Sequence, residues 1–85
     1  MKIRRIDYLL KFLEDRADPV ALDTNEDYIQ LCELLARIDV NGYVPTFSEK
    51  FGAMETVKCL YVKFRLSFER VWEHLNMMDK MWEEV

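Results

Sequence analysis

Apolar residues recur along the last third of the chain at alternating spacings of four and three. The residues that follow this pattern are Val57, Tyr61, Phe64, Phe68, Val71, Leu75, Met78 and Trp82. Such spacing places side chains on one face of a helix, and neither Pro nor Gly interrupts the segment. The pattern therefore predicts one helix of roughly 28 residues between Glu55 and Val85, about 42 Å long at 1.5 Å per residue.

A second amphipathic pattern occupies the N-terminal segment and predicts a helix over residues 3–17. Its stripe consists of Ile3, Ile6, Leu10, Leu13 and Ala17. Tyr8, Leu9 and Phe12 widen this stripe beyond what one helix contact needs. The helix is therefore either wedged between two others or offers its apolar excess to a partner protein. The candidate partner-binding residues are Ile3, Ile6, Leu10 and Leu13.

Asp18-Pro19 ends this first segment, because the residue before Pro avoids the helical region. A further helix is expected from about Asn25 to Asp39. Thr24 with Asp27 three residues later resembles a capping box at its start. Asn41-Gly42 stops it, since both residues tolerate positive φ. The apolar residues expected on its buried face are Tyr28, Leu31, Cys32, Leu35 and Ile38.

A short helix is predicted next, beginning at Thr46 and ending near Met54. Thr46 and Glu49 have the spacing of a capping box. The residues expected to anchor this helix are Phe47 and Phe51. Gly52 allows either a close helix crossing or a bend into the long C-terminal helix.

Together these patterns predict an all-α fold with a single helical domain over residues 1–85. We expect a small helical bundle of about four helices, with a helix-turn-helix-like middle and a long C-terminal helix. The formal net charge of −4 argues against binding to a nucleic-acid backbone and favours a basic or apolar protein partner. The sequence shows no signal-peptide pattern and no apolar run of about 18 residues, so we expect a cytoplasmic protein that binds no membrane.

Reactive side chains are few and isolated. His74 is the only histidine, and on a helix Glu73 points away from it while Arg70 lies one turn earlier. Cys32 and Cys59 fall inside predicted helices as small apolar residues, and neither a Cys-x-x-Cys motif nor a Gly-rich phosphate loop is present. The sequence therefore predicts a non-enzymatic protein without a catalytic site, metal or cofactor.

The segment Asn41–Gly52 carries an Asn-Gly-Tyr, a Pro-Thr and a Glu. At this spacing it resembles the start of the helix-turn-helix in the LexA-type winged-helix repressors. The resemblance implies that a DNA-reading helix follows, but the segment Val57–Tyr61 is mostly apolar where Arg, Lys, Ser and Asn would contact bases. We therefore expect the helical arrangement to serve as a scaffold without direct DNA binding.

The segment Phe64–Met78 has a Phe, Phe-Glu, Val-Trp, Leu and Met pattern, and the matching residues are Phe64, Phe68, Glu69, Val71, Trp72, Leu75 and Met77. This pattern resembles the C-terminal helix of the AsiA-type anti-sigma factors of T-even-type phages. The resemblance implies a small acidic helical phage protein, dimeric when free, that binds the promoter-recognising C-terminal domain of the host's main sigma factor. In that family, binding blocks recognition of the −35 promoter element and supports activation of middle promoters with a second phage protein.

Three functional hypotheses follow. The first is an anti-sigma-like transcription regulator that docks apolar helix faces onto a sigma factor or RNA polymerase component, in the host cytoplasm if it is phage-encoded. The alternatives are a helix-turn-helix DNA-binding protein that uses the segment Thr46–Leu60, and a self-assembling helical module such as a homodimer. The residues predicted to form an oligomer or second partner face are Phe68, Trp72, Leu75, Met78 and Trp82.

Overall fold

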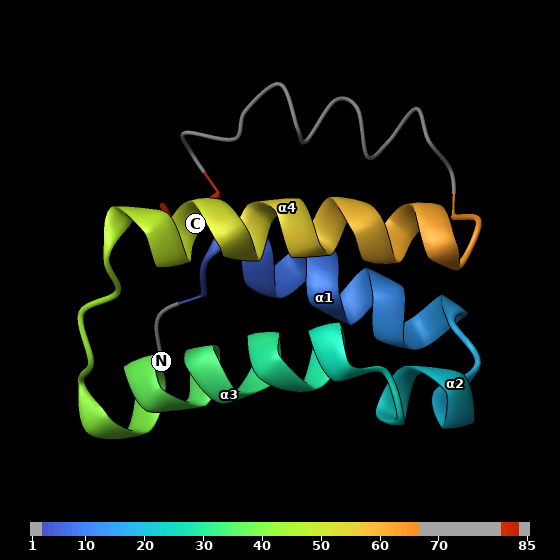
Figure 1. The fold of residues 1–85 in the computed structure, drawn as a ribbon, viewed down its shortest axis with the longest axis horizontal. Coiled ribbons are helices and arrows are strands. Elements are labelled where there is room, and N and C mark those ends of the chain that lie inside the picture. Colours follow the sequence, from blue (N-terminus) through green and yellow to red (C-terminus); the bar gives the residue numbers. More distant parts are fainter. Residues whose placement is uncertain (1–2, 67–80, 84–85) are drawn as a thin grey trace.

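The computed structural model describes residues 3–66 and 81–83, and this part of the chain contains four helices and no strand (Figure 1). The helices are α1 (Arg5–Arg16), α2 (Pro19–Asp23), α3 (Glu26–Asn41) and α4 (Phe47–Lys63). The prediction of a small all-α fold is therefore confirmed. α3 and α4 run side by side in opposite directions, and α1 packs against α4.

One cluster of buried side chains joins the four helices and the short segment 81–83. Its largest fully buried members are Tyr61, Ile6, Leu13, Leu60, Met81 and Val57. These residues come from both ends and the middle of the chain, so the helices share one core instead of forming separate pairs.

The N-terminal helix lies inside this core. Leu10 of α1 is 5% exposed, while Ile6 and Leu13 are fully buried. The structure thus corrects the assignment of these residues to a partner-binding face, because other parts of the same chain already cover them. Ile3, at 43% exposed, is the one of the four candidates that reaches the surface. The wide apolar stripe of α1 is the mark of a helix wedged among neighbours.

Tyr61 of α4 makes the closest link to α1. Its side chain is buried, and its hydroxyl donates a hydrogen bond to the backbone carbonyl of Leu9. Its ring stacks on that of Phe12, with centroids 6.0 Å apart. Burial raises the pKa of Tyr61, so the phenol stays neutral and remains a donor. The contact fixes how α4 is rotated about its axis.

The segment 81–83 returns to the first turn of α1. The carbonyl of Glu83 accepts the N–H of Arg5 at 3.2 Å, and the carbonyl of Met81 accepts the N–H of Ile6 at 3.0 Å. A helix start leaves such backbone donors without partners inside the helix. The C-terminal segment therefore satisfies two of them and ties the two ends of the chain together.

Arg4 lies beside this junction and is the buried charged residue of the described chain. Its guanidinium lies 3.0 Å from the carboxylate of Asp7 and 3.1 Å from that of Asp39 on α3. Burial alone would lower the pKa of Arg4, but the two carboxylates raise it above its usual value. Arg4 is thus a permanent charge that links the start of α1 to the end of α3.

The prediction of one uninterrupted helix from Glu55 onward is wrong, because α4 ends at Lys63. Arg65 adopts a left-handed φ of 55°, and its N–H bonds the carbonyl of Val62 while the N–H of Leu66 bonds that of Tyr61. This pair of bonds is a Schellman motif, which usually carries Gly at the left-handed position. The stripe residues outside the described part are Phe68, Val71, Leu75 and Met78.

Capping residues set the limits of α3. Asn25 caps its start by accepting the N–H of Tyr28 at 3.1 Å, which replaces the predicted Thr24–Asp27 box. The hydroxyl of Thr24 instead donates to the carbonyl of Val20 at 2.9 Å, at the end of α2. Gly42 ends α3 with a φ of 67°, as the sequence predicted.

The predicted capping box at the start of α4 is confirmed. Thr46 Oγ1 accepts the N–H of Glu49 at 3.2 Å, and the Glu49 carboxylate accepts the N–H of Thr46 at 2.9 Å. The helix then continues through Gly52, where an added Cβ would meet no atom within 4 Å. Gly52 therefore marks neither a close helix crossing nor a helix end.

Replacement of Leu10 by Asp should unfold the protein. The substitution places a carboxylate in a site that is 5% exposed, and we expect a loss of about 4 kcal/mol or more in the free energy of unfolding. Circular dichroism and urea denaturation measure this directly. Lys11→Asp, at the neighbouring exposed position, is the matched control and should keep helix content. A folded Leu10→Asp protein would contradict the burial of α1.

Replacement of Gly52 by Ala should stabilise the protein by about 0.5–1 kcal/mol, because Ala loses less backbone entropy than Gly in a helix interior. The added methyl group has space around it in the structure. The shift in the urea midpoint at unchanged slope gives the value. A decrease in stability would show that the methyl group meets a neighbour.

Candidate functional site

The reactive side chains of the described residues form no metal-binding cluster. Within residues 3–66 and 81–83, no three His, Cys, Asp or Glu side chains come together as metal ligands. Burial raises the pKa of the half-buried Cys32 thiol, which opposes formation of a nucleophilic thiolate. His74 lies outside the described residues. Two surfaces of the described part are candidate binding sites.

The first surface is an apolar face of α4. Phe47 is 82% exposed, Phe51 is 48% exposed and Val62 is 55% exposed. These residues are spaced by four and eleven, so they share one side of the helix. The expectation that Phe47 and Phe51 anchor α4 in the core is wrong. We call Phe47, Phe51 and Val62 the apolar face of α4.

The rotation of α4 explains why these side chains point to solvent. Ala53, Val57 and Leu60 are buried on another side of the same helix, turned by about 120° or more from Phe51 and Val62. Since successive residues turn by about 100°, a helix that buries these three positions turns Phe51 and Val62 to solvent, while Phe47 is exposed as the first residue of the helix. An aromatic pair exposed on a helix is a recurrent feature of protein-binding surfaces.

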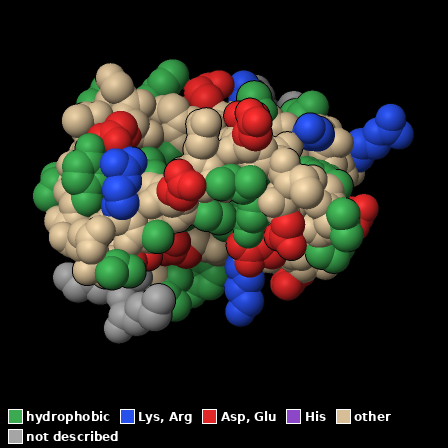
Figure 2. All heavy atoms as spheres, turned by 60° about the horizontal axis from the view of Figure 1, so that its bottom comes forward, with side chains coloured by type: hydrophobic (Ala, Val, Ile, Leu, Met, Phe, Trp, Pro, Cys, Tyr) green, Lys and Arg blue, Asp and Glu red, His purple; other side chains and the backbone are tan. Residues whose placement is uncertain are grey.

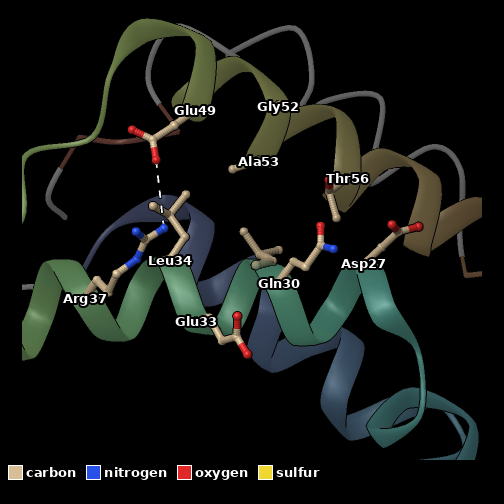
Figure 3. Close-up of a pocket in the computed structure, with 10 residues that line it drawn as sticks. Asp27, Gln30, Glu33, Leu34, Arg37, Glu49, Gly52, Ala53 and Thr56 are labelled. Carbon is tan, nitrogen blue, oxygen red and sulfur yellow. Dashed lines mark ion pairs between the residues drawn. The ribbon is translucent and has the colours of Figure 1, made fainter.

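The second surface is a groove of about 410 Å³ between α3 and α4 (Figure 3). Leu31, Leu34 and Ala53 supply its apolar floor. Polar residues and Gly52 complete the lining, and they are Asp27, Gln30, Glu33, Arg37, Glu49 and Thr56. Three carboxylates and one guanidinium therefore surround an apolar floor. We call this surface the acidic groove.

One end of the acidic groove is closed by an ion pair. Arg37 of α3 lies 3.9 Å from the carboxylate of Glu49 on α4, and Figure 3 shows the two side chains reaching toward each other. The hydroxyl of Tyr43 donates a hydrogen bond to the same carboxylate. The backbone N–H of Thr46, followed by the Tyr43 hydroxyl, lowers the pKa of Glu49. Glu49 is thus ionised near neutral pH, and its carboxylate is held at this end of the groove by Arg37, Tyr43 and Thr46.

The other end of the acidic groove stays open. Figure 3 shows Asp27 and Gln30 extending from α3 toward α4 near Thr56, while Glu33 lies on the outer edge of α3. Asp27 and Glu33 take part in no ion pair with another described residue. Figure 2 shows acidic side chains around an apolar area on the face of the molecule that is turned forward.

The predicted oligomer face is represented in the described chain by Trp82 alone. Its indole Nε1 donates to the carbonyl of Lys50 at 3.3 Å, and the Arg4 guanidinium lies 5.8 Å from the centre of its ring. Trp82 is half-buried and packs on the core. The other residues of that face lie outside the described residues, namely Phe68, Trp72, Leu75 and Met78.

The middle of the chain differs from a DNA-reading motif. A helix-turn-helix needs a turn between two helices, whereas residues 47–63 form one continuous helix, α4. The solvent side of α4 carries Phe47 and Phe51 in place of cationic or amide side chains that read bases. This geometry presents an apolar face and an acidic groove.

The chain matches no protein-family model, no curated protein and no solved structure in comparisons with each. None of the helices that the structure describes is long and apolar enough to cross a membrane.

Glu49→Gln should destabilise the protein at neutral pH, and the difference should disappear in acid. Because folding lowers the pKa of Glu49 from its usual value of 4.5, its ionised form stabilises the fold above that pH. This stabilisation is lost as the pH falls through the lowered pKa. Gln keeps an acceptor oxygen but does not titrate. Urea denaturation of both proteins at a series of pH values measures the difference.

Glu33→Gln is the matched control for this pH series. It removes a carboxylate from the same groove, but the Glu33 side chain forms no hydrogen bond or ion pair with other described residues. A gap between wild type and Glu49→Gln that persists unchanged at low pH would contradict the assigned role of the Glu49 charge.

Proposed function

We propose that this chain is a non-enzymatic regulator that acts by docking the apolar face of α4 onto another protein, of the sigma-factor or RNA polymerase class. The observation that carries the proposal is the 82% exposure of Phe47 together with Phe51 one turn later. Large apolar side chains exposed as a group mark interaction surfaces more often than single exposed ones.

Energetics support a role for these residues in binding more than in folding. Burial of an exposed Phe ring in an interface contributes about 1.5–3 kcal/mol, so two rings suffice as a binding centre. In the free protein the same rings contribute less to folding stability than buried rings do, because they remain partly in contact with water. The docking face proposed here lies on α4, whereas the sequence had suggested α1.

The class of partner rests on charge and on the sequence resemblance. A net charge of −4 favours encounter with a basic protein, and promoter-recognising domains are basic where they contact DNA. The pattern in Phe64–Met78 resembles AsiA-type anti-sigma factors, and it lies largely outside the described residues. These two arguments support an anti-sigma-like role and direct the test to a sigma-factor domain.

The double substitution Phe47→Ser with Phe51→Ser tests this function against a purified C-terminal domain of a bacterial main sigma factor. We expect wild-type protein to bind it and the double variant to bind about tenfold or more weakly. Fluorescence anisotropy measures the affinity, and thermal unfolding should show stability changed by only about 0.5 kcal/mol per site.

Val40→Ser is the control, because Val40 is 80% exposed on α3 away from the apolar face of α4. Unchanged affinity in the Phe47 and Phe51 double variant would refute the docking face. If wild type binds no sigma-factor domain, the partner class is wrong. Binding to a DNA duplex that weakens steeply with salt would instead support the helix-turn-helix alternative.

A further inference from the structure

Gly52 is an unexpected residue for its place in the fold. It lies inside α4, where Gly costs about 1 kcal/mol of stability relative to Ala. An added Cβ would meet no atom within 4 Å, and Gly52 does not adopt a positive φ. Neither helix packing nor backbone conformation therefore requires Gly at this position. Its missing side chain instead leaves the backbone of α4 open along one wall of the acidic groove.

The chemistry of the acidic groove defines what fits it. The floor of Leu31, Leu34 and Ala53 favours an apolar occupant. The carboxylates of Asp27 and Glu33 form no ion pair with another described residue, so a cationic group can pair with them. Burying apolar groups between unpaired carboxylates is unfavourable unless positive charge accompanies them. An occupant that carries both apolar and basic side chains satisfies the two requirements together.

The dimensions of the acidic groove favour a helix as that occupant. The lining residues of α3 run from Asp27 to Arg37, which is about 15 Å at 1.5 Å per residue, or nearly three helical turns. A third helix can pack in the furrow between two side-by-side helices, and small residues such as Gly52 and Ala53 permit close approach. The carboxylates are spread along the groove, as suits an elongated ligand.

We propose that the acidic groove between α3 and α4 binds a basic amphipathic helix of a partner protein. The apolar side of that helix lies over Leu34 and Ala53, with its closest approach at Gly52. Its Lys or Arg side chains pair with Asp27 at the open end and with Glu33 on the outer edge of α3, since Arg37 and Glu49 neutralise each other at the closed end. The proposal rests on the proposed function in that the chain binds a protein, but it uses a separate surface.

A pair of synthetic helical peptides of about fifteen residues tests this binding mode with the full-length protein. Both have the same Leu stripe, and the flanking positions are Lys in one peptide and Glu in the other. Anisotropy of the labelled peptides should show saturable binding of the Lys peptide that weakens with salt, and no binding of the Glu peptide. Equal binding of both peptides, or no saturable binding of the Lys peptide, overturns the proposal.

Variants of the groove locate the binding. Gly52→Gln places a long, helix-compatible side chain in the groove and should weaken binding of the Lys peptide about tenfold or more, while Gly52→Ala should bind within about threefold of wild type. The pair Asp27→Asn and Glu33→Gln should weaken binding and flatten its salt dependence. Wild-type affinity in Gly52→Gln overturns the proposal.

The Phe47→Ser and Phe51→Ser double variant separates this inference from the proposed function. It should bind the Lys peptide as wild type does, because these side chains lie on another side of α4. Loss of peptide binding in this variant but not in Gly52→Gln would overturn the groove and leave the docking face in place. Normal peptide binding by a protein that binds no sigma-factor domain would support the groove alone.

Discussion

Tyr61 joins α4 to α1 through both its hydroxyl and its ring, and this contact holds α4 in one orientation against the core. The hydroxyl bonds the carbonyl of Leu9 and the ring stacks on Phe12, so α4 is fixed in position and rotation. The same rotation buries Val57 and Leu60 and turns Phe51, on another side of α4, to solvent. The buried side of α4 and the exposure of Phe51 are therefore two consequences of one rotation.

The packing of α1 also determines which apolar residues are buried. A helix with apolar residues around much of its circumference needs several neighbours, and α4, α3 and segment 81–83 provide them. Arg4 is fixed between Asp7 and Asp39, and the backbone of 81–83 bonds the first turn. Ile6, Leu9, Leu10 and Leu13 of α1 are buried in the core, while Phe47 and Phe51 of α4 remain exposed to a partner.

Local signals in the sequence predicted much of the fold. The box formed by Thr46 and Glu49 and the stop at Gly42 depend on neighbouring residues, so they could be recognised without the tertiary structure. The end of α4 could not be predicted, because Arg65 takes a left-handed conformation that usually signals itself through Gly. Apolar spacing showed which residues share a face of a helix, but which face turns inward depends on contacts such as that of Tyr61.

The acidic groove was beyond the reach of sequence patterns for a similar reason, since its lining comes from two helices that are adjacent only after folding. Around α4, Gly52 and Thr56 are turned by roughly 100° or more from Phe51, at about 100° per residue. One partner helix is too narrow to cover both the groove and the apolar face of α4. If both surfaces bind, one partner must contact α4 with two separate elements, or two partners must bind on different sides of α4. In the second case the protein would bring two partners together through one helix.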